Sequence, residues 1–259
     1  MALTDGIVGC WSPVGQNGGG PTIRDLSKLQ NHLRWTGYTT ASDSVSSTRG
    51  ASFRAVKASA VAGQKVEANI STAGLNGYNG PWSMAAWENI ATYTQLAVSF
   101  GFGVQLPVAA GAVGRYSLQY AGNFYLWGGA NDWDTAIPYI TGRWVHVAWA
   151  WDGNRTSLYI DGVQKAATTT YIPSTPGQYA TLFSNHSSGG VTNGQVAEFC
   201  IWKRPLPASE WLELYRRGVG WLGRELRGVN RRRVYGFVPA AGFRAYWARR
   251  QNQIIGGGV

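Results

Sequence analysis

One stretch of the chain, residues 144–151, constrains the fold more than any other feature of the sequence. It reads Trp-Val-His-Val-Ala-Trp-Ala-Trp. Alternate residues of an extended strand point to opposite sides, and both sets are mostly apolar here. One set is Val145, Val147, Trp149 and Trp151, and the other is Trp144, His146, Ala148 and Ala150. The stretch therefore predicts a central strand that is covered on both sides.

The residues that follow this strand continue it as a three-strand meander. Residues 152–155 predict a turn, 156–160 a partner strand, and 163–167 a third strand. Asp161-Gly162 predicts the second turn, because Gly tolerates positive φ. Further strand candidates lie at residues 7–11, 82–87, 96–102, 116–120, 124–127, 180–183 and 196–202.

About a dozen strands predict an all-β, two-sheet antiparallel sandwich. One helix is expected before the C-terminal region, over residues 207–217, where Trp211, Leu214 and Tyr215 have helical spacing. Glu210 comes early in this segment, and Gly218 follows it as a stop signal.

Composition limits the class of protein. The 259 residues include 35 Gly, 13 Trp and 13 Tyr, and only 14% are charged, which excludes a disordered chain and a coiled coil. No apolar run approaches the roughly 18–20 residues of a membrane helix. The first ten residues lack a basic segment followed by an apolar core, so no secretion signal is expected.

Positive charge is concentrated near the C-terminus. Residues 216–259 carry ten Arg, no Lys and one acid, Glu225, so their net charge is +9, whereas the whole chain carries +10. The pI near 9.8 therefore describes this region and not the sandwich. We expect a domain over residues 1–217 and an Arg- and Gly-rich arm with a short amphipathic helix over residues 218–259.

The hairpin at residues 144–163 resembles the signature hairpin of laminin-G-like, concanavalin-A-like jelly-roll domains. Residues 194–211 resemble the closing strand of these domains and its helix, and residues 82–87 resemble their first central strand. Residues 8–11 resemble the opening strand, and residues 25–33 resemble the polar loop that follows it. The resemblance covers roughly residues 5–217 and implies a jelly roll. That fold occurs in lectins, adhesion modules, hydrolases and viral surface proteins, so the ligand stays open. The acid that commonly precedes Glu198 in this family is Ala197 here.

Catalytic motifs are missing from the sequence. Hydrolases on this jelly roll carry two or three carboxylates spaced by two on one strand, and the chain has no Glu-x-Asp-x-x-Glu. His32, His146 and His186 lie in no recognisable nucleophile motif. His146, in an apolar strand, is expected to be a hydrogen-bonded core histidine. We therefore expect a protein that is not an enzyme.

Residues Asn131, Asp132, Trp133 and Asp134 form the candidate site for carbohydrate or Ca²⁺ in an expected loop. An aromatic face flanked by oxygen atoms could stack on a sugar. Ca²⁺ needs six or more oxygen ligands, and one short peptide cannot supply them all, so the case for Ca²⁺ is weak. No other cofactor or metal is expected. The alternative is an Asx-rich turn whose Trp packs onto the sandwich.

The two cysteines, Cys10 and Cys200, fall in the expected first and last strands. These strands are neighbours in the resembled fold, so a disulfide is conceivable. Two buried free thiols fit better, because nothing in the sequence directs the chain to an oxidising compartment.

The C-terminal arm combines a basic cluster with an apolar helix face. Arg231, Arg232 and Arg233 are consecutive, and Phe243, Tyr246, Trp247 and Ile254 share one face of a predicted helix that also carries Arg249 and Arg250. Aromatic residues with Arg and without Lys are typical of protein-interface anchors. The alternative is a helix folded back on its own sandwich. Nucleic acid ranks lower as a partner, and no membrane is expected.

These observations lead to a main hypothesis and two alternatives. The main hypothesis is a non-enzymatic phage virion protein, because virion components reach the exterior without a secretion signal. It would be a homo-oligomeric capsid decoration or fibre-like module whose arm docks on capsid protein or a neighbouring subunit. The last residues also weakly resemble tailed-phage structural proteins. The first alternative is a carbohydrate-binding lectin module of a bacterial or phage surface protein that recognises a cell-surface glycan. The second alternative is a polysaccharide hydrolase or lyase with unrecognised catalytic residues.

Overall fold

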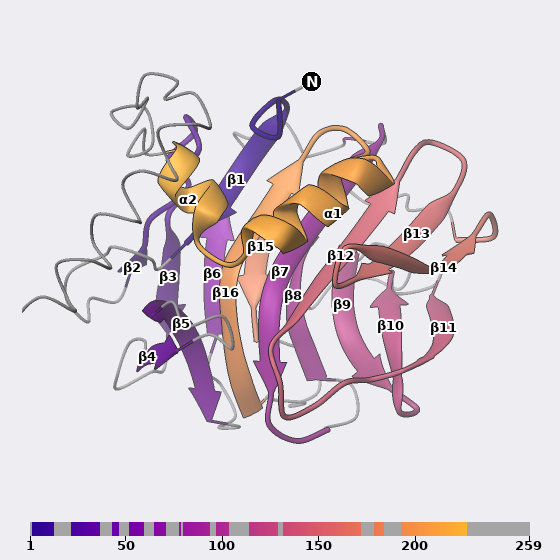
Figure 1. Cartoon of the computed structure of the whole chain (residues 1–259), viewed down its shortest axis with the longest axis horizontal. Coiled ribbons are helices and arrows are strands. Elements are labelled where there is room, and N and C mark those ends of the chain that lie inside the picture. The colour runs from indigo at the N-terminus through magenta and orange to yellow at the C-terminus, as the bar shows by residue number, and fades with distance from the viewer. Residues whose placement is uncertain are drawn as a thin grey trace, which may run out of the picture.

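Two antiparallel sheets pack face to face in the computed structural model, and two short helices lie on one outer side (Figure 1). The structure describes residues 2–12, 22–36, 43–46, 52–59, 65–70, 78, 80–93, 97–103, 114–128, 132–171, 179–183 and 193–226. No helix within these ranges is long and apolar enough to cross a membrane. The predicted all-β jelly-roll sandwich is confirmed.

The first sheet has eight strands in the described part of the chain. Its order is β14 (Val163–Thr168), β13 (Thr156–Ile160), β12 (Val145–Trp151), β7 (Trp82–Ile90), β16 (Asn193–Trp202), β5 (Ser52–Ser59) and β4 (Asp43–Ser46). The eighth strand, β1 (Ile7–Trp11), also pairs with β16. The predicted central position of residues 145–151 is confirmed, because β12 lies between β7 and β13.

The second sheet also has eight described strands. Its order is β11 (Trp133–Pro138), β10 (Asn123–Trp127), β9 (Gly114–Tyr120), β8 (Ala97–Gly103), β15 (Tyr179–Leu182), β6 (Lys65–Asn69), β3 (Leu33–Thr36) and β2 (Thr22–Ile23). The strands β2 to β6 and β11 were not expected, because several of them are short or lack a clear apolar alternation.

The core between the sheets comes from one face of each strand. All seven residues of β12 are buried, and Val145, Val147, Trp149 and Trp151 face the core. Trp82 from the first sheet meets Phe102 from the second edge to face, with 5.5 Å between ring centroids. The two apolar faces that the sequence showed in this strand therefore correspond to two separate packing layers.

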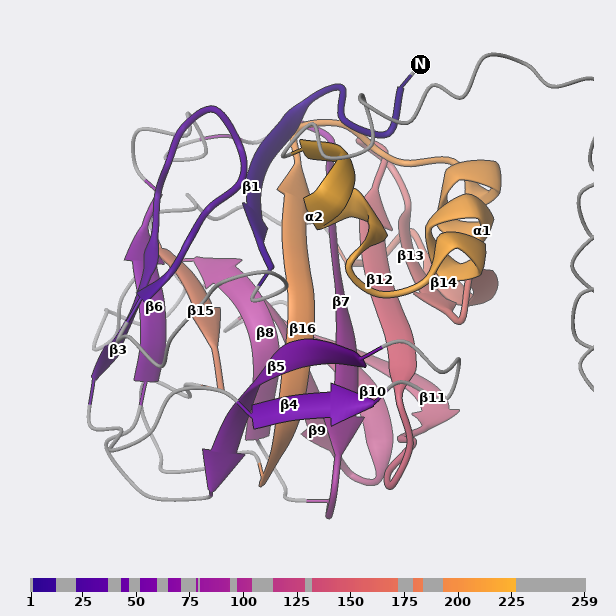
Figure 2. The ribbon, with the colours of Figure 1, turned by 60° about the vertical axis from the view of Figure 1, so that its left-hand side comes forward.

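The second packing layer lies between the first sheet and the helices, α1 (Ala208–Arg217) and α2 (Trp221–Leu226). Figure 2 shows both helices on the same side of β7, β12 and β16. The sheet presents small residues there, Ala85, Ala148 and Ala150, and Trp211 of α1 is fully buried against them. Small side chains on the sheet leave the room that a tryptophan needs.

Helix α1 confirms the prediction for residues 207–217. Glu210 lies in its first turn, and its last two residues are arginines, so both ends complement the helix dipole. Gly218 has φ 78° and donates its N–H to the carbonyls of Leu214 and Tyr215. The helix therefore ends where the sequence indicated.

Two local expectations are wrong. The Gly-rich start of the expected arm, residues 219–230, was not expected to be helical, but residues 221–226 form α2, and Val219 and Leu222 are buried. Residues 133–134 were expected in a loop, but they begin strand β11. Both segments are apolar or aromatic enough to pack, and their packing partners are distant in sequence.

A tight turn brings the hairpin of β13 and β14 close to α1. Asp161 and Gly162 have φ values of 52° and 78°, which confirms the predicted Asp-Gly turn. A Cβ on Gly162 would lie 2.9 Å from the Cα of Leu212. Glycine is therefore needed here both for the turn and for the close approach of the helix.

Candidate functional site

The predicted carbohydrate or Ca²⁺ site lies at the beginning of β11. Asn131 is outside the described residues, whereas Asp132, Trp133 and Asp134 are described. Consecutive side chains of a strand point to opposite sides, so the tryptophan and its two acidic neighbours do not share one face. The structure separates residues that the sequence placed together.

Trp133 lies on the core side of its sheet. It is half-buried, and its ring meets the fully buried Trp149 at 76°, with 5.8 Å between centroids. It packs against the core between the sheets. The alternative from the sequence, a Trp that packs onto the sandwich, describes this residue.

The two aspartates are exposed and organise the local backbone. Asp134 Oδ1 accepts hydrogen bonds from Asn123 Nδ2 at 3.0 Å and from the Ala136 N–H at 2.8 Å. Asp132 Oδ1 accepts from the Gly128 N–H at 2.9 Å. Among the described residues, no group of three His, Cys, Asp or Glu side chains is placed to hold a metal ion.

An aromatic group that the sequence analysis missed lies beside these aspartates. In β10, Phe124 and Leu126 are buried in the core, whereas Tyr125 and Trp127 are half-buried on the outer side of the sheet. Tyr120 of β9 meets Tyr125 edge to face, with 5.0 Å between centroids. We call these three residues, Tyr120, Tyr125 and Trp127, the aromatic platform.

A small apolar base supports the aromatic platform. Val98 of β8 and Leu118 of β9 are buried beneath it, and Leu118 is the register partner of Tyr125. On its other side, Tyr125 is paired with Asp134. The alternating burial of β10 was the signal that could have revealed the platform, because alternation predicts a strand with one face toward solvent.

Electrostatics keep the phenol of Tyr125 neutral. Burial, the negative charge of Asp132 and a hydrogen bond to that carboxylate together raise its pKa to about 12. The phenol is therefore protonated at every physiological pH. The outer side of β9, β10 and β11 combines aromatic rings with carboxylate and amide groups.

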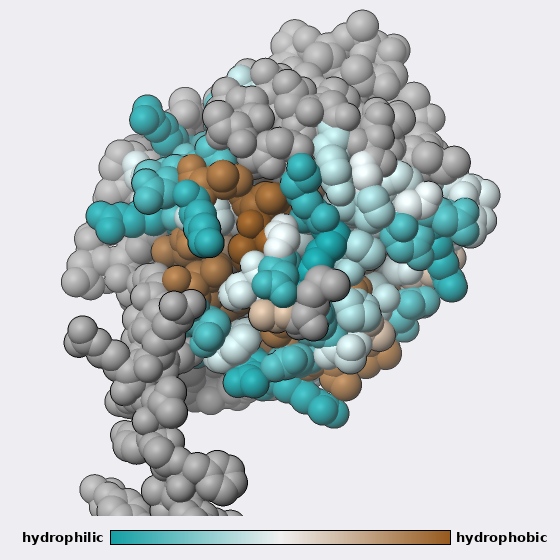
Figure 3. Space-filling model, turned by 90° about the horizontal axis from the view of Figure 1, so that it is seen from above, coloured by the Kyte–Doolittle hydropathy of each residue, from teal (hydrophilic) through white to brown (hydrophobic). Residues whose placement is uncertain are grey.

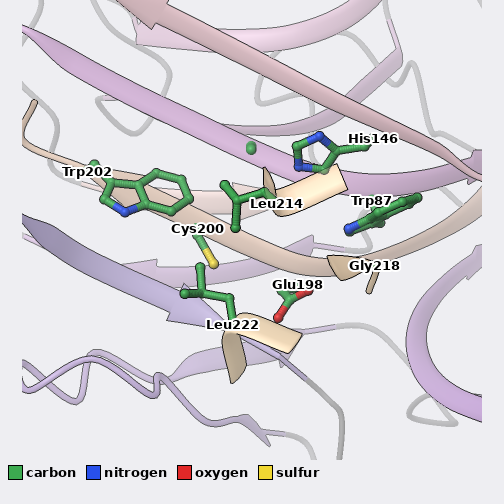
Figure 4. A pocket seen from close by; sticks show the side chains of 9 residues that line it. Trp87, His146, Glu198, Cys200, Trp202, Leu214, Gly218 and Leu222 are labelled. Atoms are coloured by element: carbon green, nitrogen blue, oxygen red, sulfur yellow. The ribbon is translucent and has the colours of Figure 1, made fainter. Parts of the chain in front are cut away.

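The opposite side of the sandwich holds a small cavity under the helices. Figure 4 shows His146 and Trp87 on one side of it, and Glu198, Cys200 and Leu222 on the other. Its volume of about 10 Å³ is enough for one water molecule. No organic ligand fits, so this cavity is not a binding site in the described conformation.

Glu198 connects the sheet to the segment that enters α2. Its carboxylate accepts the N–H of Gly220 at 2.6 Å and that of Gly223 at 2.7 Å. Its φ of 51° falls at a bulge between Ala197 and Cys200 in β16. Burial raises its pKa to about 7, although both backbone hydrogen bonds oppose that shift.

His146 is a core histidine, as expected, but it is not fully hydrogen-bonded. Burial lowers its pKa to about 4, so the ring is neutral. Its Nδ1 has no hydrogen-bond partner among the described residues. The ring packs against Trp87 at 5.2 Å and Trp211 at 6.2 Å.

The cysteines match the prediction from the sequence. Cys10 and Cys200 are direct register partners in β1 and β16, and both are buried free thiols. Burial raises the pKa of Cys200 well above its usual value. A protonated buried thiol acts as a small apolar side chain.

A second buried carboxylate lies between the sheets. Glu88 of β7 accepts a hydrogen bond from the Tyr139 hydroxyl at 2.7 Å, and that hydroxyl is 3.1 Å from the Ser99 hydroxyl. Burial raises the pKa of Glu88 to about 7. The only sequence signal was a glutamate in an otherwise mostly apolar strand.

The predicted docking arm cannot be placed. All of its candidate residues lie outside the described ranges: Arg231, Arg232, Arg233, Phe243, Tyr246, Trp247, Arg249, Arg250 and Ile254. The domain boundary at residue 217 stays a prediction. Residues 219–226, which that boundary assigns to the arm, pack on the sandwich.

Comparison with solved structures finds the same architecture in proteins of several kinds. Domain 4 of the extracellular GH43 arabinanase AbnA from Geobacillus stearothermophilus, solved with arabinotriose, has a TM-score of 0.62 and 18% identity. The match covers 80% of this chain and 97% of that domain. The binding domain of botulinum neurotoxin DC, solved with rat synaptotagmin II, has a TM-score of 0.61 and 13% identity, with 83% of this chain and 52% of that one covered.

A Trypanosoma rangeli sialidase mutant with trans-sialidase activity has a TM-score of 0.59 and 15% identity, with 83% of this chain and 33% of that one covered. The chain thus spans about half of the toxin binding domain and a third of the sialidase. At these identities the likeness shows the fold alone. No curated protein matches the sequence.

A family model described as the concanavalin A-like lectin/glucanases superfamily matches residues 62–210, more than half of the chain. The matched range contains the central strands β7 and β12, the meander that follows, and the strand β16. These elements carry most of the resemblance in the sequence, whereas residues 8–11 and 25–33 lie outside the matched range. The chain belongs to the concanavalin A-like lectin/glucanases superfamily.

Proposed function

We propose that this domain binds carbohydrate on the aromatic platform of the second sheet. The observation that carries the proposal is the outward position of Tyr125 and Trp127 beside the exposed Asp132 and Asp134. Aromatic rings pack on the C–H faces of sugars, and carboxylates accept hydrogen bonds from hydroxyl groups. Membership of a superfamily that includes lectins, and an AbnA domain solved with arabinotriose, support the same proposal.

The two outer sides of the sandwich differ in access. Both described helices cover the first sheet, whereas the platform lies on the second sheet, away from them (Figure 1). Exposed aromatic residues with adjacent polar groups are the usual composition of a ligand-binding surface. The predicted site at residues 131–134 thus keeps its aspartates, but Tyr125 and Trp127 replace Trp133 as the stacking residues.

The proposal is for binding without catalysis. The expectation that the chain is not an enzyme stays a prediction, and turnover of any polysaccharide would contradict it. The virion hypothesis also stays a prediction, as does a virion location. It depends on the arm, which lies outside the described residues, and on a weak resemblance to phage proteins that the comparisons do not extend.

The test compares three tryptophans in the full chain on a glycan array and in a titration with the strongest ligand. Trp127→Ala should weaken glycan binding at least tenfold, about 1.4 kcal/mol, because a stacking surface is lost. Trp127→Phe, which keeps an aromatic face, should retain most of the affinity. Trp221→Ala removes a tryptophan on the helix side and should not change glycan binding.

Trp133→Ala distinguishes binding on the aromatic platform from binding at residues 131–134 with Trp133 as the stacking residue. Because Trp133 packs on Trp149, its removal should lower the free energy of unfolding by about 2–4 kcal/mol, while the folded fraction still binds. If the folded Trp133→Ala protein loses binding and Trp127→Ala does not, the platform is not the site. Absence of glycan binding by the unmodified chain would end the proposal.

A further inference from the structure

A groove on the helix side of the sandwich is separate from the aromatic platform. It lies where β12 and β13 are joined and where the chain enters α1, near the upper end of Figure 1. Its volume is about 250 Å³. Pockets for drug-sized ligands usually measure about 300–1,000 Å³, so this groove suits a smaller molecule with a single ring.

Polar groups of the hairpin form one wall of the groove. Asp152 and Arg155 lie in the turn, and Ser157 and Tyr159 lie on β13. Asp152 Oδ1 accepts the N–H of Asn154 at 2.9 Å and that of Arg155 at 2.8 Å, so the carboxylate is held in place and its Oδ2 stays available. The exposed Arg155 side chain makes no ion pair with the described residues.

The other wall is apolar and rigid. Pro205 and Pro207 border the groove on the segment that leads into α1. On the hairpin wall, Tyr159 is 6% exposed and rests on Trp211, with 5.7 Å between ring centroids. Prolines and a packed tyrosine lose little conformational entropy when a ligand binds.

The charges of the groove select the class of ligand. Asp152 and Arg155 both line the groove, so a ligand with charge of a single sign would meet one like charge. A neutral polyhydroxylated ring meets no such repulsion. Its hydroxyl groups can donate to Asp152 and accept from Arg155, while its C–H face lies on the apolar wall.

We propose that this groove is a second ligand site, which takes one neutral sugar ring. The site lies on the side opposite the platform, so a chain with both sites could hold two glycans at once. This inference does not depend on the platform, and each site can fail alone. Figure 3 shows the upper end of the molecule, where hydrophilic side chains lie beside apolar ones.

The experiment measures binding of free D-galactose, D-glucose, L-arabinose and N-acetyl-D-glucosamine to the full chain by saturation-transfer NMR. The proteins carry Trp127→Ala, which removes the central ring of the platform. We expect saturable binding of at least one sugar with a dissociation constant of about 10 mM or lower. Arg155→Met should weaken it about tenfold or more, because a charged hydrogen-bond donor is lost.

Two further variants make the result specific. Lys165→Met removes an exposed positive charge from β14 and should leave sugar affinity unchanged. Asp152→Asn keeps the Oδ1 acceptor that orders the turn but loses the charge, and it should weaken binding without changing the unfolding temperature. The proposal is wrong if none of the four sugars binds, if Arg155→Met and Lys165→Met bind alike, or if acetate or sulfate displaces the sugar.

Discussion

The two outer sides of this sandwich use the same kinds of residue for different purposes. On the first sheet, Trp87 and Trp211 are buried beneath or within a helical layer, together with the acidic Glu198. On the second sheet, Tyr125 and Trp127 stay half-exposed beside Asp132 and Asp134. Residue type alone therefore does not separate a packing aromatic from a binding aromatic. Within the described part of the chain, what separates them is whether a helix covers the sheet.

The largest expected effect is the loss of stability caused by Trp211→Ala, on the side of the sandwich that the helices cover. Trp211 is fully buried and contacts Trp202 and Tyr159. Replacing such a side chain leaves a cavity and should lower the free energy of unfolding by about 3–5 kcal/mol. Urea denaturation measures this loss. Trp127→Ala, on the open side, should cost less than about 1 kcal/mol, and equal losses for the two variants would contradict the comparison.

A smaller effect, of up to about 3 kcal/mol, is expected from the pH dependence of Glu88. Its pKa is about 7 in the folded protein because of burial, against 4.5 for an exposed glutamate. The folded state thus holds a proton that the unfolded state has lost. This contribution to stability is complete below pH 4.5 and disappears as the pH rises through 7. Glu198 acts in the same direction, whereas His146, with a pKa of about 4, acts in the opposite one below pH 6.5.

Glu88→Gln tests this assignment, because glutamine is neutral at all pH values and can still accept from the Tyr139 hydroxyl. The variant should gain stability relative to the unmodified protein as the pH rises from 5 to 8, as measured by thermal or urea unfolding at each pH. Glycan binding on the platform should not follow this change. Parallel pH profiles for the two proteins would show that Glu88 does not titrate in this range.

The smallest expected effect is at the contact between α2 and the first sheet. A Cβ on Gly223 would lie 2.8 Å from Ser12 Oγ and 2.9 Å from Ser12 Cβ, so Gly223→Ala must displace the helix or the segment that follows β1. We expect a loss of about 1–2 kcal/mol. Hydrogen exchange should show faster exchange at the amides of Gly220 and residue 223, which Glu198 holds. Unchanged exchange would mean that α2 does not depend on this close contact.

The strands that the sequence predicted best have the strongest local patterns. Residues 145–151 and the meander after them were predicted because apolar runs alternate with Asp-Gly and Asx turns. Helix α1 was predicted from spacing, charge at both ends and Gly218. The strands β2 to β6 were missed because several of them are short or lack a clear apolar alternation, and β3, β5 and β6 also pair with strands distant in the sequence.

The candidate site was predicted only in part. The aspartates at residues 132 and 134 were identified, but the ring assigned to them, Trp133, faces the core. In a segment treated as a loop, the sequence does not fix the direction of each side chain. In a strand, alternate side chains point to opposite sides of the sheet. Tyr125 and Trp127 were predicted to lie in a strand, yet their use as a surface required knowing that nothing described covers that side of the sheet.

The sequence by itself determined the family, the sandwich and the buried character of both faces of β12, because these depend on local alternation and turn chemistry. Only the tertiary structure decided which aromatic rings stay exposed and which acids become buried. Glu88 and Glu198 acquire a pKa near 7 only because strands and helices from distant parts of the chain exclude water from them. Burial is a property of the assembled layers, and no short stretch of sequence contains it.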